Sequence, residues 1–184
     1  MRAHTGRRRN DAARRAILEA AAKLLACADP VTIDAIAAEA GVGRQTIYRW
    51  WPSKGAVLLE AMSELARQAA PRPDTGSLEG DLTAFLTATF RAAGTEPNTA
   101  VLRTAMAEAL RDEHAAELLR EFTAGRREEL SAVLAPWVPA AELDLAVDQA
   151  FGVLWYRLLL GHAPVDRSTA RSLAALLVRQ LQSA

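Results

Sequence analysis

The feature that most constrains this chain is a pair of short helical segments separated by a glycine. They lie in TIDAIAAEAGVGRQTIYRWWPSKGAVLLEAM, which runs from Thr32 to Met62. Thr32 is a favourable N-cap for the first segment, and Gly41 stands where a left-handed C-cap residue belongs. After the turn, RQTIYRW makes a second short helix, with Ile47 as its inward-facing apolar residue. Two short helices joined in this way behind a supporting helix predict a helix-turn-helix.

Helical patterning continues through the rest of the 184-residue chain, and no strand pattern interrupts it. Residues 1–9 are predicted to be a disordered basic arm, followed by a helix that Asn10 caps and that Asp29-Pro30 ends. Further helices are predicted from apolar spacing and turn residues, over residues 53–70, 77–94, 98–110, 112–135, 140–162 and 166–184. Asn98 is the predicted cap of the helix over 98–110. We therefore expect an all-α fold of about nine helices.

Charge is unevenly distributed along the chain, although Lys and Arg balance Asp and Glu at 22 each. Residues 1–60 hold ten Lys and Arg against six Asp and Glu, a net charge of +4, so residues 61–184 carry −4. A basic head on an acidic body indicates a polyanionic partner for the head. Charge alone leaves DNA, RNA and lipid open as that partner.

Several classes of protein are disfavoured by the sequence. No nucleophile–base pair, glycine-rich phosphate loop or pair of carboxylates at a defined spacing is present, so we expect no enzyme and no cofactor. His114 beside Asp112 and Glu113 is too little for a metal site, and none is predicted. Cys27 is the only cysteine, and it is expected to be a buried structural thiol. No apolar run is long enough to span a bilayer, so a cytoplasmic protein is expected.

The second short helix carries the chemistry of the motif. With Ile47 facing inward, five polar residues are left to face out: Arg44, Gln45, Thr46, Tyr48 and Arg49. Arginine can pair with guanine, glutamine with adenine, and threonine can touch a thymine methyl group in the major groove. Tyr48 and Arg49 can equally serve phosphates. The alternative is an ordinary helical hairpin with a solvated charged face.

The same stretch resembles the DNA-binding domain of the TetR family of bacterial transcriptional regulators. The resemblance is carried by Ile36-Ala37, Ala40-Gly41-Val42, Thr46, Tyr48, Trp51 and Ser53-Lys54. It implies a DNA-binding domain over residues 1–52 and a C-terminal effector-binding and dimerisation domain over residues 53–184. Three departures stand out, because Gly43, Gln45 and Gly55 replace a capping residue, a small residue and a glutamate that are common in the family.

Roles follow from the resemblance residue by residue. Thr32, Tyr48 and Lys54 are expected to contact phosphates, and Arg44, Gln45, Thr46 and Arg49 are the candidates for contacts with base edges. The N-terminal arginines either reach the DNA backbone or an adjacent minor groove, or are simply solvated. Trp50 and Trp51 are expected to pack the corner before the next helix.

The C-terminal half is expected to form a homodimer through the helix over 140–162 and the last helix, as a four-helix bundle between subunits. The predicted interface residues are Phe151, Gly152, Trp155, Leu159, Leu173 and Leu177. The alternative is that these residues are all intramolecular core.

A ligand pocket in this half is also implied by the resemblance. Aromatic and methionine side chains are the candidates for its wall, with ordinary core packing as the alternative: Phe85, Phe90, Met106, Phe122, Trp137, Trp155 and Tyr156. The predicted function is a homodimeric repressor that binds a palindromic DNA operator and that an unknown small-molecule effector releases. An activator, a ligand-independent regulator and a helical interaction module are the alternatives.

Overall fold

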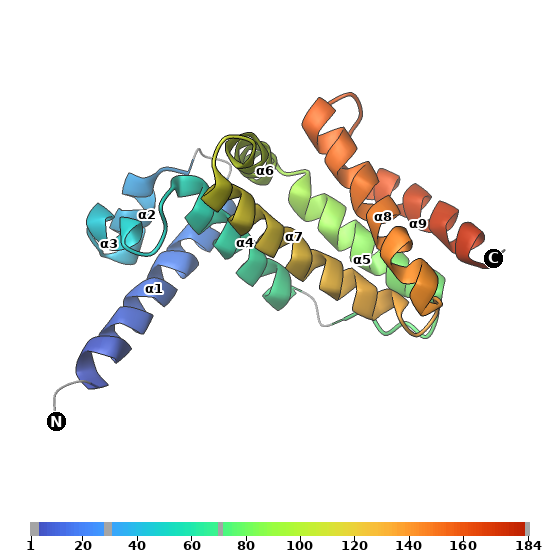
Figure 1. Cartoon of the computed structure of the whole chain (residues 1–184), viewed down its shortest axis with the longest axis horizontal. Coiled ribbons are helices and arrows are strands. Elements are labelled where there is room, and N and C mark those ends of the chain that lie inside the picture. The colour runs from blue at the N-terminus through green and yellow to red at the C-terminus, as the bar shows by residue number, and fades with distance from the viewer. Residues whose placement is uncertain (1–3, 28–30, 70–71, 183–184) are drawn as a thin grey trace. The chain divides into compact units, whose positions relative to one another are not determined.

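The computed structural model describes the chain except residues 1–3, 28–30, 70–71 and 183–184, and its described part consists of nine helices and their connections, with no strand (Figure 1). In chain order the helices are α1 (His4–Leu25), α2 (Ile33–Ala40), α3 (Arg44–Tyr48), α4 (Lys54–Ala69), α5 (Leu78–Ala93), α6 (Glu96–Ala109), α7 (Glu113–Leu134), α8 (Ala140–Leu160) and α9 (Arg167–Gln182). The all-α fold and the number of helices predicted from the sequence are confirmed for this part of the chain.

The chain divides into two compact units. The first comprises Met1–Gln68 and Ala100–Phe122, and the second comprises Ala69–Thr99 and Thr123–Ala184. Each unit is assembled from two separate segments of the chain. The predicted boundary at residue 52 between a DNA-binding and an effector-binding domain stays a prediction. We describe the two units in turn.

The first unit is built around α1, which packs against α2, and α2 packs against α3. Its centre is formed by side chains that are fully or almost fully buried: Ile17, Ala21, Ile36, Ile47, Val57, Leu58 and Ala61. Val31, just before the α2 cap, is also buried, as expected for a hydrophobic residue that packs against Ile36 one turn into the helix. The predicted apolar face of the helix-turn-helix is therefore the face that the fold buries.

Two predictions about α1 are wrong. The helix begins at His4, six residues before the predicted cap at Asn10, because Arg7–Arg9 are good helix formers and no proline stops the helix from extending. Cys27 is exposed rather than buried, because α1 ends at Leu25 and leaves it in the following turn. The predicted stop at Asp29-Pro30 lies outside the described residues.

The predicted start of α6 is also wrong. The helix begins at Glu96, so Asn98 lies inside its first turn rather than at its cap, and Asn98 Nδ2 donates to Ala92 O at 2.8 Å. Pro97 explains the shift: proline is tolerated in the first helical turn, where its missing N–H would have no partner.

The second unit packs α5 and α8 against α9 (Figure 1). Its core is made of large aliphatic and aromatic side chains: Leu82, Leu86, Phe90, Leu130, Leu134, Val147, Leu154, Leu158, Leu173 and Leu177. Two helix starts in this unit, those of α5 and α9, have a side-chain cap. Ser77 accepts a hydrogen bond from the Gly80 N–H at 3.1 Å, and Asp166 from the Thr169 N–H at 2.8 Å.

Candidate nucleic-acid interface

The turn between α2 and α3 fixes the direction in which α3 leaves the first unit. Thr32 Oγ1 accepts a hydrogen bond from the Ala35 N–H at 3.1 Å, as predicted for the α2 cap. At the other end, Gly41 adopts φ 65° and ψ 33°, a left-handed conformation that side-chain-bearing residues rarely adopt. The Val42 N–H then bonds back to Ala37 O at 3.0 Å, which closes the end of α2.

The short helix α3 is anchored by one side chain. Ile47 is fully buried, whereas Gln45, Tyr48 and Arg49 are exposed, with 52% of Tyr48 accessible to solvent. Gly43 stands at the N-cap without a side-chain hydrogen bond, as its lack of a side chain requires. The helix therefore presents an amide, a phenol and a guanidinium outward while it is held from below by a single isoleucine.

Two of the predicted base-reading residues, Arg44 and Thr46, are less available for contact with DNA. Arg44 forms an ion pair with Asp34 of α2, although both side chains are 63% exposed, so solvent screens the pair and a stronger anion can compete for the guanidinium. Thr46 is half-buried. Gln45 and Arg49 are the predicted base-edge residues that are exposed and take no part in this ion pair.

Lys54 and Thr32 complete the predicted set. Lys54 is the exposed first residue of α4, where Ser53 Oγ accepts a hydrogen bond from the Ala56 N–H at 3.1 Å. The start of a helix carries partial positive charge, so the lysine adds to a site that favours a phosphate. Thr32 is exposed as well, with its hydroxyl oxygen already used in the α2 cap.

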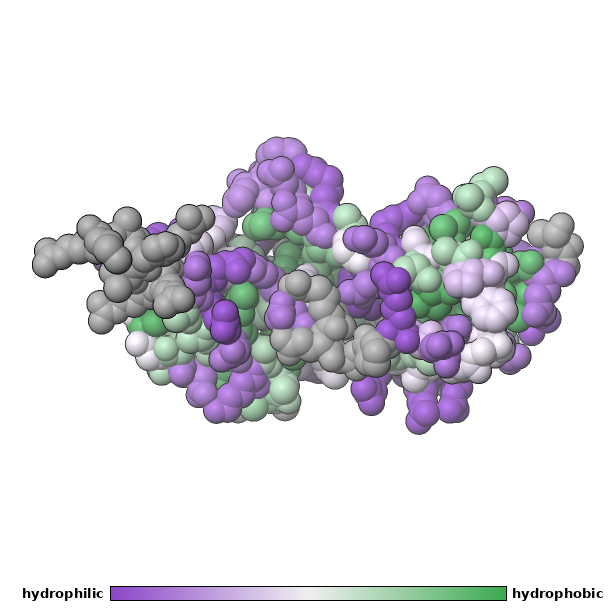
Figure 2. Space-filling model, turned by 90° about the horizontal axis from the view of Figure 1, so that it is seen from below, coloured by the Kyte–Doolittle hydropathy of each residue, from purple (hydrophilic) through white to green (hydrophobic). Residues whose placement is uncertain are grey.

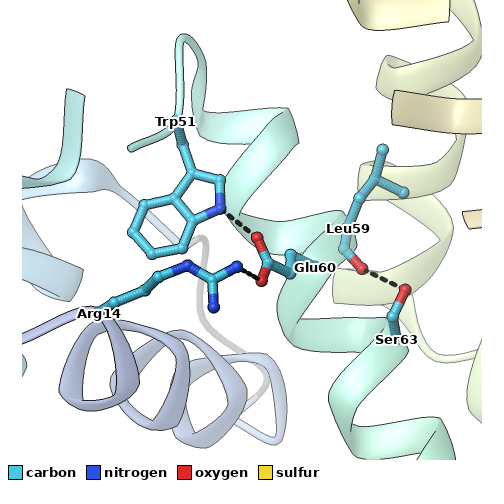
Figure 3. Close-up of polar contacts among 5 residues, drawn as sticks. All are labelled: Arg14, Trp51, Leu59, Glu60 and Ser63. Atoms are coloured by element: carbon cyan, nitrogen blue, oxygen red, sulfur yellow. Dashed lines mark hydrogen bonds and ion pairs between the residues drawn. The ribbon is translucent and has the colours of Figure 1, made fainter. Parts of the chain in front are cut away.

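The corner that follows α3 is packed by tryptophan, as the sequence predicts. Trp51 is 3% exposed, and its indole Nε1 donates a hydrogen bond of 2.6 Å to Glu60 of α4 (Figure 3). The other carboxylate oxygen of Glu60 pairs with Arg14 of α1, whose guanidinium carbon lies 5.8 Å from the ring centroid of Trp50 and 5.6 Å from that of Trp51. We call Arg14, Trp51 and Glu60 the corner cluster.

Sequence reasoning missed the corner cluster. Arg14 and Glu60 are 46 residues apart, and each fits the polar face of its own helix, so neither pattern points to the other. The available signal was the indole itself, because a tryptophan that packs a corner needs an acceptor for its N–H.

The predicted interface residues of the second unit range from buried to exposed. Phe151, Leu173 and Leu177 are buried within the unit, and Trp155 is half-buried. Gly152 and Leu159 are exposed, and they share the outer face of α8 with Leu145 and Tyr156. Contact of these residues with a second subunit stays a prediction.

The predicted pocket residues also range from buried to exposed. Phe90 is fully buried and Phe85 nearly so, while Trp137 is 43% and Tyr156 60% exposed. Met106, Phe122 and Trp155 are half-buried, and Met106 and Phe122 belong to the first unit rather than the second. The ligand pocket also stays a prediction.

Within the described residues, no three His, Cys, Asp or Glu side chains gather as metal ligands would. None of the described helices is long and apolar enough to cross a membrane.

A helix-turn-helix whose second helix shows polar side chains to solvent defines a DNA-binding protein of the transcriptional-regulator class. Family comparison agrees with this class. Residues 17–61 match the family described as "Bacterial regulatory proteins, tetR family", and residues 72–177 match "Tetracyclin repressor-like, C-terminal domain".

Relatives match over most of their length. The HTH-type transcriptional regulator YdeS of Bacillus subtilis (strain 168) is 32% identical over 181 residues, which cover 94% of this chain and 91% of YdeS. The HTH-type transcriptional regulator Rv1556 of Mycobacterium tuberculosis (strain ATCC 25618 / H37Rv) is 30% identical over 79% of this chain and 74% of its own. The crystal structure of the TetR family transcription regulator SCO0332 superposes with a TM-score of 0.76 at 30% identity, covering 90% of this chain and 96% of that one.

The chain belongs to the TetR family of transcriptional regulators, as the resemblance in its sequence predicted. It is a regulator of the helix-turn-helix type, and the proteins that it resembles in sequence and fold are regulators rather than enzymes.

Proposed function

We propose that the protein is a homodimeric transcriptional repressor, acting in the bacterial cytoplasm, that binds a palindromic operator and is released from it by a small molecule. The observation that carries the DNA-binding part is the outward display of Gln45, Tyr48 and Arg49 around the buried Ile47. In this proposal Gln45 and Arg49 read base edges, together with Arg44 once its pair with Asp34 opens.

Phosphate contacts set the position of the reading helix. Tyr48 on α3, Lys54 at the start of α4 and Thr32 at the start of α2 are exposed groups of the kind that hydrogen-bond to phosphate oxygens. These contacts supply affinity that is independent of sequence and sensitive to salt.

Dimerisation is supported by the apolar surface of the second unit. Leu145, Gly152, Tyr156 and Leu159 follow one another along α8 at intervals of seven, four and three residues, which places them on one helical face. Leu145 is 61% and Tyr156 60% exposed, and Leu176 on α9 is 57% exposed. Hydrophobic residues, coloured green, are visible at the surface of this unit (right in Figure 2).

A homodimer explains why such a surface is retained, because isologous pairing of α8 and α9 would bury it. In a two-fold symmetric dimer the two copies of α3 would bind two inverted half-sites, spaced by roughly one helical turn of DNA. The proposed operator is therefore palindromic.

A ligand-dependent release is supported by the match of residues 72–177 to the C-terminal domain of tetracycline-repressor-like proteins. For release to occur, the ligand must bind the non-binding conformation more tightly than the operator-binding one. We place the effector in the second unit, which holds the predicted pocket residues Phe85, Phe90, Trp137, Trp155 and Tyr156.

The DNA-binding part is tested by gel-shift and fluorescence-anisotropy titrations with the DNA upstream of the protein's own gene and with duplexes selected from a random pool. Replacing Tyr48 and Arg49 together by alanine is expected to weaken binding by about 2–6 kcal/mol, since each lost contact contributes about 1–3 kcal/mol. Arg91→Ala, which removes an exposed arginine of α5, is the matched control.

Unchanged operator affinity of the double variant, with the fold intact by circular dichroism, would contradict the assignment of α3 as the reading helix. Run-off transcription from the bound promoter separates the two signs of regulation. A repressor lowers the transcript when the protein is added, and an activator raises it.

A further inference from the structure

The carboxylate of Glu60 connects three elements of the first unit. It lies on α4, accepts the Trp51 indole N–H at 2.6 Å from the corner after α3, and pairs with Arg14 of α1 (Figure 3). Its side chain is 31% exposed and that of Arg14 is 41% exposed. Both oxygens are used, and each binds a group from a different element.

Arg14 extends the same arrangement to the second tryptophan. Its guanidinium lies within 6 Å of both indole centroids, a distance at which a cation is attracted to the ring faces. Trp50 and Trp51 are tilted by 47° with their centroids 6.5 Å apart. Among the described residues, Trp50 Nε1 is buried without a hydrogen-bond partner, so the Trp50 ring is held by packing and by Arg14.

The negative charge of Glu60 lies in the unit that is proposed to bind DNA. A negative charge in a DNA-binding unit repels the phosphate backbone, so neutralising it should, by charge alone, strengthen DNA binding. Only a positional role for Glu60 predicts the opposite sign, and the sign of one measured change can therefore separate the two effects.

We propose that Glu60 is a positioning residue for DNA binding: by holding the Trp51 indole and the Arg14 guanidinium at once, it fixes the corner from which α3 meets the major groove. The proposal rests on the proposed DNA-binding function. Without the carboxylate the corner occupies other orientations, and the apparent affinity falls by the fraction of molecules in which α3 is correctly placed.

The decisive variant is Glu60→Gln, which keeps the shape of the side chain and removes its charge. We expect operator affinity to fall about tenfold, because the uncharged amide offers one acceptor oxygen to two donors, so one of the two interactions is lost and the other is weakened. The slope of log K against log salt concentration should stay at the wild-type value, since no phosphate contact is lost. Lys54→Ala, the matched loss of a phosphate contact, should lower that slope by about one.

A readout that does not involve DNA keeps the two hypotheses apart. The indole N–H resonance of Trp51, assigned with Trp51→Phe, should move upfield in Glu60→Gln, because its acceptor is no longer a carboxylate. If the wild-type protein binds no DNA duplex at all, the proposed function fails, and the proposal about Glu60 fails with it even where the resonance moves as expected.

The control is Glu39→Gln. Glu39 also pairs with a basic residue of α1, since Lys23 Nζ lies 2.6 Å from its carboxylate, but it receives no hydrogen bond from the α3 corner in the described contacts. Its neutralisation should leave operator affinity within about twofold of wild type or strengthen it slightly, as charge alone predicts.

Unchanged or tighter operator binding by Glu60→Gln would overturn the proposal. So would a loss of affinity that follows only the loss of folded protein, measured as the folded fraction by circular dichroism at the temperature of the binding assay. If Glu60→Gln fails to fold, Glu60→Asp replaces it. It keeps the charge, shortens the reach by one methylene and should weaken binding in the folded protein, and wild-type affinity there would equally overturn the proposal.

Discussion

The two units of the molecule use polar and apolar side chains in opposite ways. In the first unit, the helix that faces outward shows Gln45, Tyr48 and Arg49 to solvent and buries Ile47. In the second unit, α8 shows Leu145 and Leu159 to solvent, while the charged residue Asp81 is buried. The comparison indicates two kinds of partner: a hydrogen-bonding polyanion for the first unit, and an apolar surface for the second.

The interior charges of the second unit are satisfied by local partners. Arg126 donates to Thr89 Oγ1 at 2.8 Å, pairs with Glu129 one turn along α7, and lies 5.2 Å from the ring centroid of Phe85. Burial lowers the pKa of Arg126, and the neighbouring Glu129 opposes that shift. Asp81 is likewise buried, and it accepts hydrogen bonds from the Thr75 N–H at 2.7 Å and the Thr75 hydroxyl at 2.8 Å.

The largest effect is expected where the first unit is most tightly packed. Trp51→Ala empties a buried site and leaves Glu60 without its indole donor, so the free energy of unfolding should fall by about 3–5 kcal/mol. Urea unfolding followed by circular dichroism measures this loss. Leu110→Ala, at a side chain that is 82% exposed in the same unit, should change stability by less than about 0.5 kcal/mol. Equal losses for the two variants would contradict the packing role of Trp51.

The proposed role of the exposed apolar residues of α8 in dimerisation can be tested by substitution. Leu145→Glu combined with Leu159→Glu should convert the proposed dimer into a folded monomer, because two buried carboxylates at the interface would be unpaired. Operator affinity should then fall by about 100-fold or more, since linked heads bind together far more tightly than single ones. Sedimentation velocity and anisotropy measure the two effects, with Leu110→Glu as the control. A dimer that survives both substitutions would remove α8 from the interface.

The buried carboxylate of Asp81 in the second unit predicts a smaller effect on stability, which is present near neutral pH and lost in acid. The Thr75 N–H, and then the Thr75 hydroxyl, lower the pKa of Asp81 below its ordinary value of 3.8, with burial acting in the opposite direction. A lowered pKa in the folded state stabilises the fold above the ordinary pKa, and this contribution is lost as the pH falls through the lowered value.

Asp81→Asn should therefore unfold at a lower temperature than the wild type near pH 7, and the difference in Tm should shrink below about pH 4. Differential scanning calorimetry between pH 2.5 and 7 measures it. Asp74→Asn, an exposed neighbour in the preceding loop, is the control. A Tm difference that stays constant over this range would show that ionised Asp81 contributes nothing through Thr75.

The smallest effect concerns the start of α4. An added Cβ at Gly55 would lie 2.8 Å from Glu108 Oε2, the far end of a flexible side chain that can move aside. Alanine is a better helix former than glycine, so Gly55→Ala should stabilise the first unit by up to about 0.5 kcal/mol. When Glu108 is also replaced by alanine, Gly55→Ala should stabilise the unit by about 1 kcal/mol. This gain is measured by urea unfolding of the double variant against Glu108→Ala alone. Clear destabilisation by Gly55→Ala in both backgrounds would show that the position has no room for a side chain.

Most helix ends could be predicted from the sequence because they depend on neighbouring residues. Thr32, Gly41 and Ser53 cap their helices as predicted, since each acts on backbone groups within four residues. The errors at Asn10 and Asn98 have one cause: a good capping residue was available, but the helix continued past it because the preceding residues also tolerate helix.

The candidate DNA surface was predictable for the same local reason, because a five-residue helix with one buried isoleucine leaves few choices for its other side chains. The corner cluster was not, since Arg14 and Glu60 come together only in the folded unit. The dimer and the pocket depend on molecules outside the chain. The predicted residues Phe151 and Leu173 satisfy an intramolecular core equally well.

The conformation of Gly41 limits which residues can replace it in the turn between α2 and α3. Its φ of 65° comes with no heavy atom within 4 Å of the position of a Cβ, so the demand at this residue concerns chirality and not space. The turn that aims α3 depends on one achiral residue in a chain of L-amino acids. D-alanine, whose stereochemistry favours this φ, suits the site better than L-alanine of identical composition and volume.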